Sequence, residues 1–463
     1  MRSKRLFLIL CLAGVFGLVF FALSTPGLET SNIYSFDSLD ETPPIIVIFT
    51  ESTRADHVGP CYGYERETMP NVCDLSEDGV LFQEAHSQSS WTPAAMSTFF
   101  TSLSPNQAGL PDWAYHLSFD ADTFTEELSE SGYTVREGEG QTHLAEVGLL
   151  QGFDGKTDQI ERDKDQFLDF YFYADHAHWP YFAEQEFRHW DNLSAETPAE
   201  IREKWETEPF ENRTASKQTF VDLYNADMKQ GDNEIGQIIQ DLKDEGIYEE
   251  SLIIYTSDHG QRFGEDSYLE DFTHQEPVAQ HEGPADPALT HVPLVVKFPG
   301  NEYAGTEISE PVRLIDLGTT IIDYVGLRED FGIGKSVIPL IEGETQERTI
   351  FSVQHFGIEN PGFRASLIEE DKVYQIEDAK RVCADETDVS NSVLYWRDKD
   401  PENPFITEDI GDRVNDSQME ENLREELCDA YTKGGWREYY YLPEEERMSE
   451  NLEDQLRQLG YIE

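Results

Sequence analysis

Ile45-Ile-Val-Ile-Phe-Thr50, followed by Glu51-Ser-Thr-Arg-Ala-Asp56-His57, is the stretch that decides the fold class. Five of its first six residues are apolar and five of the six are β-branched, which is typical of a buried strand. Similar runs recur at residues 167–174, 252–257 and 292–298. Helical candidates lie between them, at residues 93–102, 121–131, 217–245 and 315–325. Strands that alternate with helices predict an α/β domain whose central, mostly parallel sheet is flanked by helices.

Side chains that could bind a metal follow two of these predicted strands. Glu51 comes directly after the run 45–50, and Asp258-His259-Gly260 follows the run 252–257. Functional side chains collect where strands of an α/β sheet end. Two carboxylates and an imidazole suit Zn or Mn. Taken singly, Glu51 could equally be a solvated loop acid and Asp258 a helix cap, so it is the combination that predicts a site.

Thr92 precedes Pro93 in Ser90-Trp-Thr-Pro-Ala-Ala-Met-Ser97. Proline favours the first helical position and threonine is a common N-cap, so this pattern predicts that Thr92 caps a helix. A plain cap is the simpler interpretation. The functional one is that a metal activates the Thr92 hydroxyl as a nucleophile while the helix N-terminus holds an anionic substrate. Ser90 and Ser97 are neighbouring hydroxyls without the helix-start position.

The composition is strongly acidic, with 93 Asp and Glu against 34 Lys and Arg and a formal net charge of -59 over 463 residues. Aromatic residues make up 12% of the chain, which argues against a disordered acidic chain. Acidity spread over a globular protein indicates a surface adapted to very high salt, where repulsion between carboxylates is screened. The same charge excludes nucleic acid as a partner.

The N-terminus predicts export. Residues 1–5 are basic and an apolar run extends from Leu6 to Leu23, so residues 1–25 are a membrane anchor or a signal peptide. The weak cleavage pattern favours an anchor, with the protein on the extracytoplasmic face of the cell membrane, or secreted if cleaved. Residues 26–44 are predicted to be a linker, 45–335 a catalytic domain and 336–463 a smaller C-terminal subdomain.

The chain has five cysteines, and their number is consistent with an exported protein that forms disulfides. Cys11 lies in the apolar run. The others permit two disulfides, and the pairs that close the shortest loops are Cys61 with Cys73 and Cys383 with Cys428.

The segments 47–57, 62–71 and 79–85 resemble the opening motifs of the sulfatase family of the alkaline phosphatase superfamily. The resemblance continues in order through residues 92–103, 151–154, 178–181, 255–260, 291–295, 314–320, 334–336 and 456–463. It covers nearly everything after residue 44. It implies an alkaline-phosphatase-like fold and a metal-dependent enzyme that acts on sulfate or phosphate esters.

Position by position, the resemblance implies four metal ligands: Glu51, Thr92, Asp258 and His259. Thr92, His178 and His281 would be catalytic. His178 would contact the anionic group of the substrate and His281 the substrate or its leaving group, with His274 as the alternative. One divalent ion is implied, Zn or Mn before Ca or Mg.

Three departures limit the resemblance to sulfatases that use formylglycine. Thr92 stands where those enzymes have cysteine or serine, Met96 stands where they have arginine, and Glu51 replaces a pair of aspartates. The four ligands match by type the site of phosphoethanolamine and phosphoglycerol transferases. The length and C-terminal part resemble threonine-bearing sulfatase-like proteins of halophilic archaea.

Three hypotheses follow from these patterns. The first is a hydrolase that cleaves sulfate or phosphate esters through a covalent intermediate on Thr92. The second is a transferase of the phosphoethanolamine or phosphoglycerol type that acts on a cell-surface lipid or glycan. The third is a non-catalytic surface binding protein. The expected substrate is a sulfated or phosphorylated glycan, lipid or small ester.

Overall fold

The structure is a computed structural model. The chain divides into two units, Met1–Asp37 and Ser38–Glu463, and everything described belongs to the second. The predicted anchor at residues 1–25 lies outside the described residues, as does all but the end of the predicted linker. The described residues are 42–110, 115–118, 120–138, 142–157, 166–173, 214–263, 287–328, 331–356, 362–369, 372–376, 382–383, 392–399, 407–414, 416–432 and 440–441.

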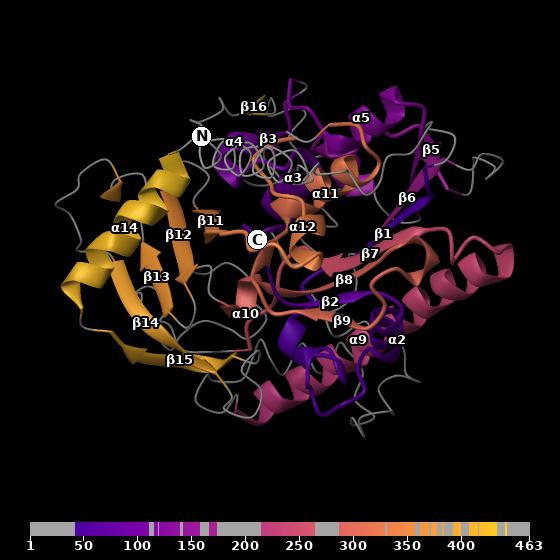
Figure 1. Cartoon of the computed structure of the whole chain (residues 1–463). Coiled ribbons are helices and arrows are strands. Elements are labelled where there is room, and N and C mark those ends of the chain that lie inside the picture. The colour runs from indigo at the N-terminus through magenta and orange to yellow at the C-terminus, as the bar shows by residue number, and fades with distance from the viewer. Residues whose placement is uncertain are drawn as a thin grey trace, which may run out of the picture. The chain divides into compact units, whose positions relative to one another are not determined.

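A nine-stranded sheet forms the centre of the molecule (Figure 1). The strands run in the order β10-β2-β8-β7-β1-β6-β4-β5, with β9 also paired to β2. Only β8 runs antiparallel to its neighbours within this sheet, so the predicted mostly parallel sheet is confirmed. The strands are β1 (Ile45–Thr50), β2 (Val80–His86), β4 (Thr134–Glu137), β5 (Gly155–Lys156), β6 (Phe167–Tyr173), β7 (Leu252–Ser257), β8 (His291–Lys297), β9 (Thr306–Ile308) and β10 (Val312–Arg313).

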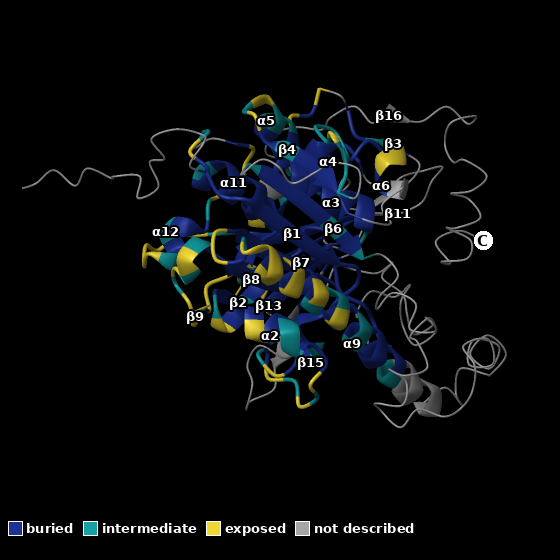
Figure 2. Ribbon diagram, turned by 90° about the vertical axis from the view of Figure 1, so that its right-hand side faces the viewer, coloured by how far each residue is buried: buried dark blue, intermediate teal, exposed yellow. Residues whose placement is uncertain are grey.

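Strand β1 lies between β6 and β7, and all six of its residues are buried (Figure 2). Alternate side chains of a strand point to opposite faces of the sheet. Ile46 and Ile48 pack in the same core cluster as residues of the long helix α9. Phe49 points the other way, with its ring 4.8 Å from that of Phe99 in α3. A continuous apolar strand therefore reflects helices on both faces.

Figure 1 shows α2 and α9 on one side of the sheet and α3, α5 and α11 on the other. These helices confirm the four predicted ones and add α2. Within the described ranges, no helix combines the length and the apolar character needed to cross a membrane. The bounds are α2 (Pro70–Glu77), α3 (Thr92–Thr101), α5 (Phe124–Glu130), α9 (Thr214–Glu245) and α11 (Ile315–Tyr324).

A second, antiparallel sheet follows in sequence and runs in the order β11-β12-β13-β14-β15. Helix α14 packs with it around a core of its own. This sheet lies within the range predicted as a C-terminal subdomain, although the boundary at residue 336 stays a prediction. Its elements are β11 (Ile350–Phe356), β12 (Gly362–Glu369), β13 (Lys372–Ile376), β14 (Ser392–Lys399), β15 (Thr407–Arg413) and α14 (Ser417–Thr432).

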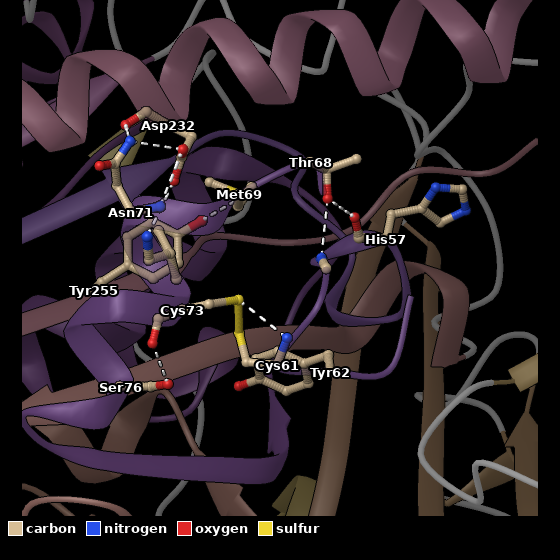
Figure 3. The surroundings of a disulfide bond; sticks show 12 residues. His57, Cys61, Tyr62, Thr68, Met69, Asn71, Cys73, Ser76, Asp232 and Tyr255 are labelled. Carbon is tan, nitrogen blue, oxygen red and sulfur yellow. Dashed lines mark hydrogen bonds between the residues drawn. A yellow bond between two sulfur atoms is a disulfide. The ribbon is translucent and has the colours of Figure 1, made fainter. Parts of the chain in front are cut away.

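The described residues contain two disulfides, Cys61–Cys73 and Cys383–Cys428, which are the two pairs predicted because they close the shortest loops. Figure 3 shows the first, which fixes the loop before α2 to that helix. The second joins Cys383 to α14. The remaining short elements are η2 (Ala55–His57), α4 (Pro105–Ala108), β3 (Tyr115–His116), α6 (Thr142–Glu146), α10 (Pro287–Thr290), η5 (Pro299–Asn301), α12 (Ile338–Ile341) and β16 (Tyr440–Tyr441).

Candidate active site and metal centre

Three predicted ligands meet at the ends of β1 and β7. These strands pair in parallel with Thr50 opposite Ser257, so the residues that follow them are also neighbours. Glu51, Asp258 and His259 are buried, and each offers a ligand atom within 4.8 Å of the others. The register of two adjacent strands therefore explains why ligands about two hundred positions apart converge.

Thr92 completes the cluster from the first turn of α3. Its Oγ1 donates to Glu51 Oε1 at 3.3 Å and lies 3.2 Å from His259 Nε2. The prediction that Thr92 is the N-cap is wrong: Trp91 has the extended N-cap backbone, and the helix begins at Thr92. Because its own backbone is already helical, the Thr92 hydroxyl is not engaged with the helix amides and can face the two ligands.

The hydrogen bonds of His259 define which ring nitrogen carries the proton. Nδ1 lies 2.8 Å from the carbonyl oxygen of Gly260, and a carbonyl only accepts, so Nδ1 is protonated in the neutral ring. Nε2 is then unprotonated, and it lies 3.2 Å from Thr92 Oγ1 and 3.4 Å from Asp258 Oδ2, two oxygen atoms that could share a cation with it. This is the tautomer that a metal-binding histidine requires.

Asp258 also presents an available oxygen. Oδ1 accepts hydrogen bonds from the backbone amides of Ser52 at 3.0 Å and His259 at 2.8 Å. Oδ2 is buried, and no residue in the described part of the chain donates to it. A buried carboxylate oxygen without a donor is costly unless a cation balances it. The residues therefore fit a divalent ion between Asp258 Oδ2, His259 Nε2, Glu51 and Thr92.

Gly260 allows the loop after β7 to lie close to its surroundings. A Cβ at this position would be 2.1 Å from the carbonyl oxygen of Ala288 and 3.2 Å from Arg54 Cγ. The Gly260 amide donates to Leu289 O at 2.7 Å. The glycine is thus required by close packing, which in turn holds the carbonyl that orients His259.

A buried ion pair braces the loop after β1. Arg54 donates to Asp56 through Nε at 2.9 Å and Nη2 at 2.7 Å, and through Nη1 to Gln261 O at 3.0 Å. Burial alone would raise the pKa of Asp56, but the charge and hydrogen bonds of Arg54 outweigh it and lower this pKa to about 2. Arg54 therefore links the two loops that carry the ligands.

Of the other predicted site residues, some lie outside the described part of the chain and others form hydrogen bonds away from the cluster. His178, His281 and the alternative His274 lie outside the described residues. Ser90 Oγ donates to Gln354 Oε1 at 2.8 Å, and Ser97 Oγ donates to Ala94 O at 2.8 Å. Neither serine hydroxyl is bonded to the predicted ligands.

Sequence reasoning missed two hydroxyl groups that support the site. Ser257 Oγ accepts from Thr53 N at 2.8 Å and lies 2.7 Å from Thr50 O and 2.9 Å from His259 O, so it joins the two strand ends. Tyr224 in α9 contacts the backbone of the same turn. Ser257 ends a predicted strand beside the Asp-His-Gly segment, which is the only signal for it; Tyr224 has none.

Comparison with known proteins identifies the family to which this fold and this cluster of possible metal ligands belong. The sequence model of the sulfatase family matches residues 43–144 and 148–327. The chain belongs to the sulfatase family.

Curated relatives match over limited lengths. Arylsulfatase K of Danio rerio is 33% identical over 120 residues, which are 26% of this chain and 21% of that protein. An ulvan-active sulfatase of Formosa agariphila is 23% identical over 324 residues, 67% of this chain and 60% of that protein. The chain thus spans less than two thirds of either relative.

Solved structures share the fold. The phosphonate monoester hydrolase of Agrobacterium radiobacter superposes with a TM-score of 0.63 at 16% identity, covering 85% of this chain and 96% of that one. A structure in complex with its substrate D-glucosamine-2-N,6-O-disulfate gives a TM-score of 0.60 at 16% identity, covering 91% and 98%. At this identity the likeness concerns the fold alone.

Proposed function

We propose that this protein hydrolyses sulfate esters of a glycan, with Thr92 as the nucleophile and one divalent ion held by Glu51, Thr92, Asp258 and His259. Membership of the sulfatase family supports the reaction class. The observation that carries the proposed nucleophile is the position of Thr92 Oγ1, within 3.3 Å of both Glu51 Oε1 and His259 Nε2.

The donor set favours Zn or Mn over Ca or Mg. It combines two carboxylates and a hydroxyl with an imidazole, which hard oxygen-seeking ions do not select. When bound, such an ion lowers the pKa of a coordinated hydroxyl and offsets negative charge on the transferred group. The protein contributes rigid placement of the four donors on two strand ends and one helix start.

The first step breaks the bond between sulfur and the oxygen of the leaving group. Thr92 Oγ1 forms a bond to sulfur while its proton passes to Glu51 Oε1, the acceptor of its hydrogen bond. The bond between sulfur and the sugar oxygen breaks, and that oxygen takes a proton from a general acid, for which His281 stays the prediction. His178 is expected to contact the sulfuryl oxygens.

The second step regenerates Thr92. Water attacks the sulfur of the sulfated threonine, the bond between sulfur and Oγ1 breaks, and Oγ1 takes back the proton held by Glu51. The water gives one proton to the general acid and the other to solvent, and inorganic sulfate leaves.

A sulfated sugar is the proposed substrate class. Relatives include an ulvan-active sulfatase and an N-acetylglucosamine-6-O-sulfatase of Bacteroides thetaiotaomicron, both named for carbohydrate substrates. The two disulfides support an exported protein, because such bonds persist in oxidising compartments. A membrane anchor at residues 1–25 and adaptation to high salt stay part of this proposal.

The second candidate is a phosphotransferase, because Glu51, Thr92, Asp258 and His259 match by residue type the site of phosphoethanolamine and phosphoglycerol transferases. Met96, the residue in place of the formylglycine sulfatases' arginine, is fully buried in α3, which argues against a formylglycine mechanism. A phosphoethanolamine or phosphoglycerol transferase would use the same first step on phosphorus. An acceptor alcohol on a lipid or glycan would then replace water in the second.

Paired substrates test the proposal. The protein is assayed at high salt with an aryl sulfate and an aryl phosphate, with Zn or Mn added, as wild type, Thr92→Ala and Ser97→Ala. Sulfate release that is lost in Thr92→Ala and kept in Ser97→Ala is expected, because Ser97 is bonded within its own helix. Turnover only of the phosphate would make the protein a phosphate-ester hydrolase, and product formed only with an added alcohol would move the function to the transferase. A protein that binds no metal and turns over neither ester would support the non-catalytic hypothesis.

A further inference from the structure

The turn that follows Glu51 has an unfavourable backbone conformation. Ser52 has a φ of 59°, in the left-handed region that side chains other than glycine rarely adopt. The residue is fully buried, so its peptide groups must find partners within the protein. A turn of this kind persists only where the surroundings fix it.

Side chains from two places in the fold, the end of β7 and helix α9, supply such partners. The Ser52 amide donates to Asp258 Oδ1 at 3.0 Å, and the Thr53 amide donates to Ser257 Oγ at 2.8 Å. Both acceptors belong to the end of β7. Two further backbone groups, the carbonyl of Ser52 and the amide of Arg54, are both bonded by Tyr224.

The hydroxyl of Tyr224 bonds this turn at two points, and we call this pair of hydrogen bonds the clamp. It accepts from Arg54 N at 2.8 Å and donates to Ser52 O at 2.8 Å. Its one proton and one of its lone pairs are thus both used on backbone groups two residues apart. The ring is fully buried and packs edge-on against Phe263, with centroids 4.8 Å apart.

We propose that Tyr224 is a positioning residue for the metal centre, acting from α9 by holding the Ser52–Arg54 turn so that the Glu51 carboxylate faces Thr92 and His259. This inference rests on the proposed function, because it assigns a role toward the same divalent ion. Without the hydroxyl, the hydrogen bonds that Tyr224 makes to Ser52 O and Arg54 N are lost, which weakens the hold on the strained φ of Ser52. Glu51 is the adjacent residue, so such relaxation moves a ligand directly.

Tyr62 offers a matched control. It is a second buried tyrosine of the same core, and its hydroxyl also bridges two backbone groups, accepting from Leu294 N at 2.7 Å and donating to Phe82 O at 2.7 Å (its ring is labelled in Figure 3). Those partners lie in β8 and β2, neither of which carries a predicted ligand. Tyr224→Phe and Tyr62→Phe therefore remove the same group from equivalent surroundings, one beside the metal site and one away from it.

The experiment measures Mn²⁺ binding to the full chain at constant high salt, with free Mn²⁺ followed by electron paramagnetic resonance and thermal unfolding recorded in parallel. Both variants are expected to lower Tm. Only Tyr224→Phe is expected to raise the Kd for Mn²⁺, by about tenfold, as for other residues that orient a metal ligand. Tyr62→Phe is expected to stay within about twofold of the wild type, well below that effect.

Equal Kd values in the wild type and Tyr224→Phe would overturn the inference and leave the proposed function standing. A wild type that binds neither Mn²⁺ nor Zn²⁺ would overturn both. Should Tyr224→Phe not accumulate as folded protein, the hydroxyl is removed in a Ser52→Gly background, because glycine adopts positive φ without steric cost. Because the two hydrogen bonds of Tyr224 are lost even where glycine relieves the strain, a Kd that rises by more than about twofold when Tyr224→Phe is added to Ser52→Gly supports the clamp, and a smaller change refutes it.

Discussion

Asp56→Asn tests whether the buried ion pair braces the loop that carries Glu51. Both members are nearly inaccessible, and Arg54 donates two hydrogen bonds to the carboxylate. The substitution leaves a buried guanidinium beside a neutral amide. Breaking a buried pair in this way costs about 3 to 5 kcal/mol of unfolding free energy.

The pH dependence of the unfolding free energy gives a second, independent value for the contribution of this ion pair. Burial acts to raise the pKa of Asp56, but Arg54 lowers it from 3.8 to about 2. This lowering of the Asp56 pKa corresponds to about 2 kcal/mol of unfolding free energy. Because the pKa is lowered on folding, that stability is present above pH 4 and is lost as the pH falls from about 4 to about 2. The difference between wild type and Asp56→Asn should therefore shrink over this window.

The assay is urea unfolding at fixed high salt between pH 7 and the lowest pH at which the protein stays folded. Asp169→Asn is the control, since Arg136 Nε donates to Asp169 Oδ1 at 2.6 Å in an equally buried pair opposite the start of β1. Both variants should lose stability, and only Asp56→Asn should also lower kcat/KM for the folded enzyme. A loss below about 1 kcal/mol, the level of an exposed pair, or a difference that does not change with pH would refute the bracing role.

Three further perturbations have defined outcomes. Replacing Cys383 and Cys428 by serine opens a 45-residue loop and should cost about 4 kcal/mol in urea unfolding; an unchanged midpoint would contradict this. Gly260→Ala places Cβ 2.1 Å from Ala288 O, so the loop after β7 must move and the Kd for Mn²⁺ should rise about tenfold; unaltered binding would show that the loop tolerates the shift. With a net charge of -59, lowering salt from about 1 M to about 0.1 M lengthens screening from about 3 to about 10 Å and should lower Tm steeply, whereas a flat profile would oppose salt adaptation.

The parts of the fold that could be predicted are those with a strong local signal. The central strands are continuous apolar runs, because helices cover both faces of the sheet. Glu51, Asp258 and His259 were found because each follows such a run directly. The antiparallel strands of the second sheet carry many polar residues, so their periodicity gave no comparable signal, and only a smaller subdomain was expected there.

The missed features depend on contacts between distant residues. Tyr224 lies 172 positions after Ser52, and within an amphipathic helix a tyrosine is indistinguishable from any other core residue. The positive φ of Ser52 also has no signal, since glycine or asparagine would be the usual choice. Thr92 was misplaced by one position because tryptophan is an uncommon N-cap, although its backbone takes that role.

Different parts of the fold position the proposed nucleophile Thr92 and the other three proposed ligands, so the two proposed roles can be tested separately. Glu51, Asp258 and His259 are fixed by the register of β1 and β7, whereas Thr92 is fixed by where α3 packs. Gly318 of α11 controls that packing, because a Cβ there would lie 2.6 Å from Ser102 Oγ and 2.8 Å from Phe99 O. Gly318→Ala should therefore displace α3 and lower kcat by at least about tenfold, since catalysis depends steeply on the position of the attacking atom. The Kd for Mn²⁺ should change far less than in Gly260→Ala, because the strand ends stay in place. If Gly318→Ala weakens metal binding as much as Gly260→Ala does, Thr92 contributes to holding the ion as strongly as the strand-end ligands, and the separation is wrong.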